Sequence, residues 1–486
     1  MTMRTPMRLF RLALLAGALA APAMAFSTPA LAGPLSFSPF SVGPKYVARD
    51  PKPAVLLNAD PAAVTLAAEP GAAWWTVFED PVLNDLVGRA VAGNLDLKQA
   101  EARLRQARSI FKDRRLDVLP RITSDGTYNR SDEQIPGFGP ARVPVESADI
   151  GFDAAWEIDL FGRVRHGVEA ARSDAGAADA DLRAAKVSVM AEVARTYFQL
   201  RGAQARLKVA RENEDTQKET VRLTQVRFEV GRGDPVDVKS AQARLSATEA
   251  TIPDLQAQEA AARYRLDVLL GLRPGALDQT LAPPASPPPA LVKPLPIGDA
   301  AQFLRRRPDV QAAEWRLRAE TARTGVATAD LFPRIRVTGF IGLLSGDVSK
   351  LFAHGAQAWS VSPQVTWPAL DLGGAHARLK AQEARQDEIL AAYDQTVLVA
   401  VQDLETALNA YRQQQRQIVS LAEQVDASRG AADLARIRYK EGSIDFLVLL
   451  DAERTLLAAE DALTAAQTDA NTDIVAIYKA LGGGWS

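Results

Sequence analysis

The spacing of apolar and polar residues changes along this chain between a period of two and a period of seven. From 149 to 159 the two kinds alternate, which predicts a β-strand with one apolar and one polar face. Segments 335–343 and 359–367 alternate similarly, and segment 122–129 does so more weakly. Strands of about 9 to 11 residues suit a membrane β-sheet, but a half-buried soluble sheet alternates in the same way, so alternation alone leaves both open. The apolar face of the clearest strand contains Ile150, Phe152, Ala154, Trp156 and Ile158.

Long helices with a seven-residue repeat follow these strands. Between His376 and Glu441 there is no proline, and apolar residues recur at every seventh position from Val397 to Tyr439. This pattern predicts a coiled-coil helix about 100 Å long. A similar segment covers about 167–230. Each long helix is expected to turn at a glycine-containing loop into a returning helix that ends near 271 or 482.

The chain contains two copies of one unit. The segment Arg227–Asp234 resembles Arg438–Asp445, 211 positions later, and the segment 119–122 resembles 332–335, 213 positions later. We expect a first repeat at 75–272, with a helix, a β-hairpin at about 121–159 and a helical hairpin at about 167–271. The second repeat spans 299–482, with its β-hairpin at about 334–368 and its helical hairpin at about 376–481. A proline-rich linker, 273–298, separates them, and 483–486 form a tail.

The first residues resemble a secretory signal. Three arginines precede a short apolar run, and Ala23-Met24-Ala25 supplies the small residues of a cleavage site, which predicts a signal peptide at 1–25. Cleavage after Ala32 is the second possibility. The apolar run has about half of the roughly 20 residues that a membrane-spanning helix needs. Segment 26–74 is then an extended N-terminal part of the mature chain.

Composition excludes several kinds of chemistry. The 57 basic residues nearly balance the 59 acidic ones, so the charge pattern of a nucleic-acid-binding protein is absent. There is no cysteine, and the three histidines, which we expect to be surface or packing residues, are far apart. We therefore expect no catalytic site, no cofactor and no metal site. A secreted enzyme is disfavoured, whereas a periplasmic coiled-coil scaffold would share the signal and the heptads but needs no outward-facing aromatic strands.

Strands and helices together favour a membrane channel. Four strands cannot close a barrel in lipid, where an open edge would leave backbone groups unpaired. Three chains would give 12 strands, and two would give 8, which is too few for an open channel. Trp156 and Trp367 are then expected in an aromatic girdle at the membrane interface.

Several motifs carry a resemblance to a known family over essentially the whole mature chain, namely Asp80–Leu86, Asn94–Leu97, Trp156–Gly162, Arg306–Glu314, Leu331–Ile335 and Ala480–Trp485. The sequence is similar to the outer-membrane efflux channels, the TolC-like outer membrane factors, and most of all to the branch that serves resistance-nodulation-division (RND) pumps. The resemblance implies a mainly α chain with a membrane β part. It implies a homotrimeric 12-stranded β-barrel in outer-membrane lipid, continued by a long periplasmic α-helical coiled-coil barrel. It also implies partners, a periplasmic adaptor and an inner-membrane RND pump, for which the channel is a passive exit duct. Many members of this branch carry lipid on a cysteine, which this chain lacks.

Two groups of residues are candidates for functional sites. The hairpin turns would face the adaptor, although any helix reversal favours a glycine and an Asp cap. The turn residues are Gly231, Asp234, Gly442 and Asp445, with Arg227, Arg438 and Tyr439 beside them. Asp433 and Arg436 are candidates for the periplasmic gate that closes the channel at rest. Their i,i+3 spacing equally suits a solvated pair within one helix.

Overall fold

The computed structural model describes residues 40–49, 56–59, 64–65, 71–134, 142–282, 294–298 and 303–483. Contacts divide the chain into Met1–Phe37 and Ser38–Ser486, and the following description concerns the second unit. The predicted signal peptide, its cleavage sites and the last residues of the tail lie outside the described residues. Among the described helices, none is long and apolar enough to cross a bilayer.

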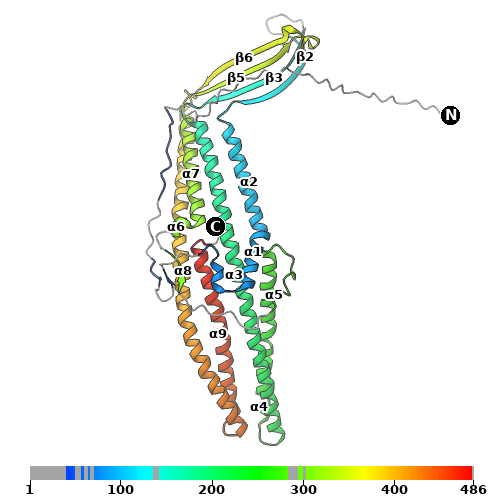
Figure 1. The fold of residues 1–486 in the computed structure, drawn as a ribbon, viewed down its shortest axis with the longest axis vertical. Coiled ribbons are helices and arrows are strands. Elements are labelled where there is room, and N and C mark those ends of the chain that lie inside the picture. Colours follow the sequence, from blue (N-terminus) through cyan, green and yellow to red (C-terminus); the bar gives the residue numbers. More distant parts are fainter. Residues whose placement is uncertain are drawn as a thin grey trace, which may run out of the picture. The chain divides into compact units, whose positions relative to one another are not determined.

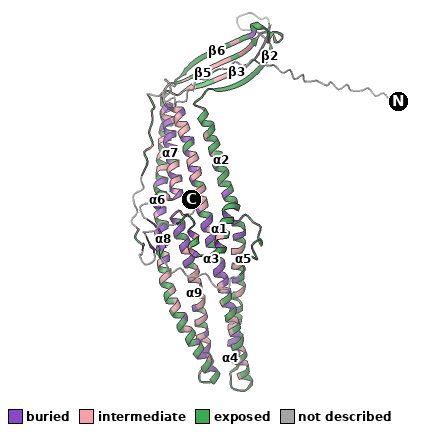
Figure 2. Cartoon of the chain, in the orientation of Figure 1, coloured by how far each residue is buried: buried purple, intermediate pink, exposed green. Residues whose placement is uncertain are grey.

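Four antiparallel strands form the main sheet, as the alternation predicts. They are β2 (Arg121–Gln134), β3 (Arg142–Ile158), β5 (Arg334–Ser345) and β6 (Gln357–Thr366), in the order β2-β3-β5-β6. Their side chains are mostly exposed or half-buried (Figure 2). Two short strands, β1 (Val64–Thr65) and β4 (Leu295–Pro296), form a separate parallel pair.

The two β-hairpins share one register. Arg121 lies opposite Ala155 in the first hairpin, and Arg334 lies opposite Thr366 in the second. Arg334 lies 213 positions after Arg121, and Thr366 lies 211 positions after Ala155, the same separations that relate the repeated motifs in the sequence. The repeat is therefore a repeat of geometry as well as of residue types.

The first hairpin is longer than the alternation indicates. The alternating segments 122–129 and 149–159 leave 130–148 as a loop between them, but residues 130–134 pair with 142–146 and extend both strands. These residues are mostly polar, so no alternation marks them, and the ladder of backbone hydrogen bonds maintains the strand instead. In the second hairpin, β5 is followed by two short turns of 3₁₀ helix, η2 (Val348–Lys350) and η3 (His354–Ala356).

Helices extend away from the sheet (Figure 1). The longest helices are α3 (Arg163–Glu229) and α8 (Leu372–Glu441), which follow the sheet hairpins and have 67 and 70 residues. Their length of about 100 Å agrees with the heptad pattern. The remaining helices of the described chain are η1 (Trp74–Phe78), α1 (Pro81–Gly93), α2 (Leu95–Leu116), α4 (Pro235–Glu249), α5 (Thr251–Leu269), α6 (Phe303–Arg306), α7 (Pro308–Ala329) and α9 (Phe446–Ala480).

The returning arm of the first helical hairpin differs from the expected single helix. It is divided at Ala250 into α4 and α5, whereas α9 in the second copy continues for 35 residues. Pro253 explains the division, because it lacks the N–H that would bond to the carbonyl of Glu249 in a continuous helix.

The largest hydrophobic core lies midway along the helices. Buried side chains of α1, α3, α8 and α9 meet there, among them Leu86, Leu200, Leu404 and Tyr478. A second, smaller core lies at the far end, where α3 turns into α4 and α8 turns into α9. The candidate tip residues surround this second core.

Candidate functional site

The two tip turns are built alike. Gly231 and Gly442 end the long helices with φ of +72° and +78°, a backbone conformation that favours glycine. The carboxylate of Asp234 caps α4 by accepting a hydrogen bond of 2.8 Å from the N–H of Val236. Asp445 occupies the same position before α9, but its side chain makes no capping bond. Both turns therefore have the predicted glycine, and one of them has the predicted Asp cap.

Arg227 joins the two hairpins at the tip. Its guanidinium lies 4.4 Å from the centre of the Tyr439 ring and donates a hydrogen bond to the Tyr439 carbonyl. Tyr439 is 3% exposed and packs against Phe446, with their ring centres 5.6 Å apart. Burial raises the pKa of Tyr439, although Arg227 opposes this effect. Of the three flanking residues, only Arg438 has an exposed side chain, so Arg227 and Tyr439 are placed to hold the tip's shape.

Asp433 and Arg436, the candidate gate residues, form an ion pair of 3.0 Å on α8. Arg436 also pairs with Glu453 of α9 at 3.1 Å. Glu453 is 5% exposed and accepts a hydrogen bond of 3.2 Å from the hydroxyl of Thr220 on α3. The arginine therefore spans an exposed carboxylate and a buried one, and the buried carboxylate connects three helices.

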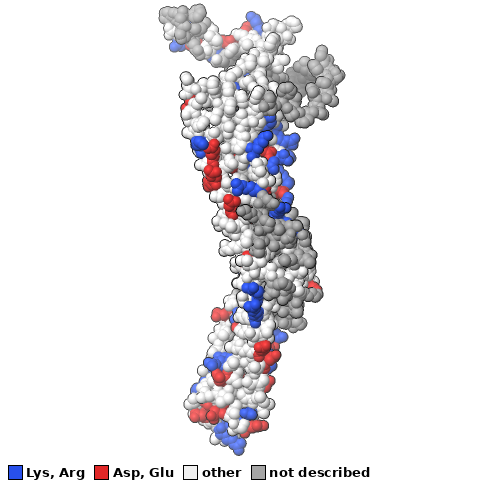
Figure 3. Space-filling view, turned by 90° about the vertical axis from the view of Figure 1, so that its left-hand side faces the viewer, with Lys and Arg blue, Asp and Glu red and all other residues white. Residues whose placement is uncertain are grey.

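The sequence analysis did not single out Glu453. Its partners are 17 and 233 positions away, so no local spacing marks it. Burial raises the pKa of the Glu453 carboxyl above its ordinary value, although Arg436 and Thr220 oppose this effect. On the face that Figure 3 shows, charged side chains of both signs lie at the end of the molecule that carries the tips.

The two tryptophans occupy equivalent places. The indole N–H of Trp156 donates to the carbonyl of Val118, and that of Trp367 donates to the carbonyl of Leu331, each at 3.0 Å. Their side chains remain partly exposed, at 37% and 50%. Both accepting carbonyls lie just before a sheet hairpin, so each tryptophan joins the end of a strand to the incoming chain.

The polar face of the sheet carries one aromatic side chain. Phe340 lies opposite Asp153, and its ring covers Gly151 and Gly342, where an added Cβ would come within 2.6 to 2.8 Å of the ring. Glycines at both positions leave room for the ring on this face. The alternation of β5 had not indicated an aromatic side chain there.

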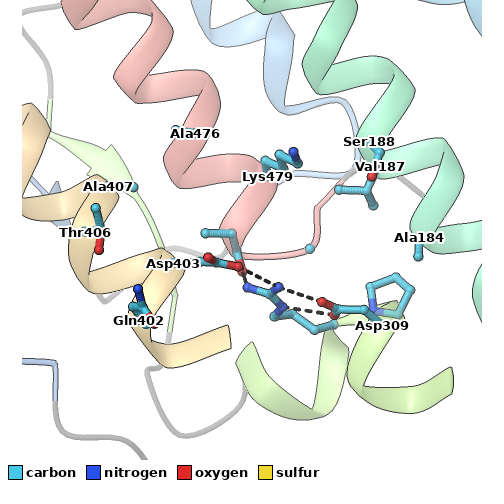
Figure 4. Close-up of a pocket in the computed structure, with 14 residues that line it drawn as sticks. Ala184, Val187, Ser188, Asp309, Gln402, Asp403, Thr406, Ala407, Ala476 and Lys479 are labelled. Carbon is cyan, nitrogen blue, oxygen red and sulfur yellow. Dashed lines mark hydrogen bonds and ion pairs between the residues drawn. The ribbon is translucent and has the colours of Figure 1, made fainter. Parts of the chain in front are cut away.

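Arg307 forms a buried joint beside a cavity of about 380 Å³. Its guanidinium donates to Asp309 at 2.6 and 3.0 Å, to Asp403 at 3.1 Å, and to the carbonyl of Ala480 at 3.0 Å. In Figure 4, dashed lines lead from one guanidinium to Asp403 on one side and to Asp309 on the other. Burial raises the pKa of Asp309, but the Arg307 guanidinium outweighs burial and keeps this pKa below its ordinary value. The joint fastens the start of α7 to α8 and to the end of α9.

A simpler form of the same joint exists in the first repeat. Asn94, 213 positions before Arg307, is 3% exposed and donates a hydrogen bond of 2.8 Å to the carbonyl of Leu269. Its side-chain oxygen also accepts bonds from the first N–H groups of α2. Both repeats therefore fasten their first helices to the end of their returning arm.

No arrangement suited to metal binding is present in the parts of the chain that the structure describes, where no three His, Cys, Asp or Glu side chains are placed to share an ion. The functional candidates are therefore the tips, the tryptophans, the sheet edges and the two joints.

Comparison with known proteins decides the family. The family model described as "Outer membrane efflux protein" matches residues 86–272 and 300–483. The chain belongs to this family. The resemblance inferred from the motifs is confirmed, and the protein is an outer-membrane efflux channel rather than an enzyme.

Individual relatives match the efflux channel over most of its length. The toluene efflux pump outer membrane protein TtgC of Pseudomonas putida is 32% identical over 424 residues, 86% of either chain. OprJ of Pseudomonas aeruginosa is 32% identical over 416 residues, 85% of this chain and 86% of OprJ. The solved outer-membrane channel OprN is 46% identical, with a TM-score of 0.88 over 91% of this chain and 99% of OprN. The open state of MtrE from Neisseria gonorrhoeae is 31% identical, with a TM-score of 0.81 over 92% and 99% of the two chains.

Proposed function

We propose that three copies of this chain form one outer-membrane channel, the passive exit duct of a tripartite efflux system. An inner-membrane RND-type pump would deliver substrates to this duct through a periplasmic adaptor. The observation that carries the proposal is a four-stranded sheet with two open edges, joined to helices of about 100 Å.

The sheet edges support the oligomer. Among the described strands, β2 pairs only with β3 and β6 pairs only with β5. An open edge in lipid leaves N–H and C=O groups without partners, at a cost of several kcal/mol for each group. Pairing of β6 with β2 of a neighbouring copy removes both edges, and three copies give the 12 strands that an open channel requires.

The faces of the strands support the membrane assignment. Ile150 and Phe152 on one face of β3 are 46% and 57% exposed, and Ile341 of the adjacent β5 is 65% exposed. Asp149 and Asp153 lie on the other face. A barrel with the first face toward lipid and the second toward the pore satisfies both sets of side chains. We propose that Trp156 and Trp367 form its periplasmic aromatic girdle.

The tips are the proposed contact with the adaptor. Val236 and Leu447, on the two returning helices just after the turns, are 65% and 66% exposed, and the charged turn residues Asp234 and Asp445 are also exposed. Such apolar side chains next to charges favour a protein partner. The predicted gate at Asp433 and Arg436 lies close to these turns, so an adaptor bound there could alter the Arg436–Glu453 pair.

We propose that the barrel alone holds the chain in the membrane, without a lipid anchor. SilC of Salmonella typhimurium, a 27% identical relative, is described as a probable outer membrane lipoprotein, but the present sequence contains no cysteine to carry lipid. Other relatives are named for toluene or antibiotic efflux, and we infer small-molecule substrates for this channel.

Complementation tests the proposal. A strain that keeps the cognate adaptor and pump but lacks this channel should become sensitive to the compounds that the pump transports. The wild-type chain should restore resistance, whereas the Phe152→Arg variant, which places a charge on the proposed lipid face, should restore less of it. Resistance that does not depend on the chain would contradict the proposed function.

A further inference from the structure

A polar pattern repeats in both helical hairpins. In the second hairpin, Arg429 of α8 pairs with Glu460 of α9 at 2.9 Å. Asn213 of α3, in the first hairpin, reaches the same carboxylate with its side-chain nitrogen at 3.5 Å. This amide connects the two hairpins within one chain.

The first hairpin carries the same kinds of residue 211 positions earlier. Lys218 and Glu249 correspond to Arg429 and Glu460, and Gln424 corresponds to Asn213. Gln424 and Glu249 are both exposed in the single chain. Gln424 on α8 and Glu249 on α4 are therefore the repeat counterparts of Asn213 and Glu460. Within the described parts of one chain, they do not make the contact that joins Asn213 to Glu460.

The tip shows the same asymmetry. Arg227 covers the Tyr439 ring, which is 3% exposed, but the corresponding ring, Phe228, is 42% exposed. The corresponding arginine, Arg438, is exposed. Leu434 is likewise 59% exposed, whereas its counterpart Leu223 packs against the tip core. One copy of each contact is made, and the residues for a second copy face solvent.

We propose that the contact between the hairpins of one chain is repeated between neighbouring chains. Arg438 of one copy covers the ring of Phe228 in a second copy, and Gln424 faces Glu249 of that copy. This inference rests on the proposed trimer and assigns residues to its periplasmic interface. A cation over an aromatic ring contributes about 0.5–2 kcal/mol, depending on desolvation.

A second copy of this chain fits these residues better than another partner does. Each member of the two pairs is the repeat counterpart of a residue that already makes the same kind of contact in the chain. Leu434 and Ile437, on α8 beside Arg438, are 59% and 55% exposed and would be covered by the same neighbour. Closed rings of this kind use the same patches on every copy.

Cysteine cross-linking tests the inference directly, because the natural sequence contains no cysteine. The double variant Arg438→Cys with Phe228→Cys, treated in membranes with a short bismaleimide, should move most of the chain into covalent dimer and trimer bands. Gln424→Cys with Glu249→Cys should do the same. The matched control is Lys440→Cys with Phe228→Cys, because Lys440 lies two residues beyond Arg438, about 200° around the helix.

The native mass of each variant accompanies the cross-linking and separates the outcomes. Trimers that cross-link through both pairs but not through the control support the inference. Trimers in which neither pair cross-links, or in which the control cross-links equally, overturn the assigned contacts and leave the trimer intact. A wild-type chain that extracts as a monomer overturns the trimer and the inference together.

Discussion

Replacing Arg307 by alanine should loosen the joint between α7, α8 and α9. The side chain is 8% exposed and donates to two carboxylates and to the carbonyl of Ala480. Removing one partner of a buried ion pair costs about 3–5 kcal/mol. Asp309 and Asp403 are 42% and 47% exposed, so water recovers part of this loss, and we expect about 3 kcal/mol.

Two other variants calibrate this value. Asn94→Ala removes the simpler joint and a helix cap, and should cost about 1–2 kcal/mol. Arg454→Ala removes an ion pair whose side chains are 64% and 65% exposed, and should change stability by less than about 0.5 kcal/mol.

Hydrogen exchange measures these effects, at the end of α9 for Arg307→Ala and Arg454→Ala and at the end of α5 for Asn94→Ala, because Asn94 bonds to Leu269 there. The free energy of local opening is defined at each place even when the whole chain does not unfold in one step. The expected order of destabilisation is Arg307→Ala, then Asn94→Ala, then Arg454→Ala. Equal exchange in the Arg307 and Arg454 variants would refute the assignment of Arg307 as a joint.

Three further predictions concern the barrel and the tip. Phe152→Arg should destabilise the barrel by about 2–4 kcal/mol near the bilayer midplane, measured by unfolding from lipid, whereas Asp153→Arg should leave assembly intact and change ion selectivity. Equal tolerance of both variants would argue against the membrane assignment. Because the folded-state pKa of Glu453 is raised, the folded tip binds its proton more tightly than the unfolded chain does. We therefore expect the free energy of opening at the tip, taken as wild type minus Glu453→Gln, to rise as pH falls from neutral toward the ordinary carboxyl pKa. A difference that does not change with pH would contradict this. Asp433→Arg should raise resting conductance in a planar bilayer if Asp433 and Arg436 close the channel, and unchanged conductance in both Asp433→Arg and Arg436→Asp would assign them to a pair within one chain.

Local patterns predicted the features that depend on neighbouring residues. The strand around Phe152 alternates because one face is apolar, and the helix ending at Glu441 follows a heptad pattern over its whole length. Both are visible in the sequence because their period is short compared with the element. The turn glycines Gly231 and Gly442 were also predictable, since a helix reversal requires positive φ.

Contacts between distant residues could not be predicted in this way. Arg307 is part of a recognisable motif, but Asp403 and Ala480 lie 96 and 173 positions away, so its role depends on how the helices pack. In the sequence, Glu453 is likewise one of many acidic residues, and only its contacts with Thr220 and Arg436 in the folded chain distinguish it. Pro253 did carry a local signal for the division of the returning arm at Ala250.

The number of copies in the particle extracted from outer membranes tests the central claim most directly. Native mass spectrometry of the wild-type chain in mild detergent should give three copies, because four strands per chain then close a 12-stranded barrel. A particle that contains one or two copies, from membranes in which the channel supports efflux, would contradict the account.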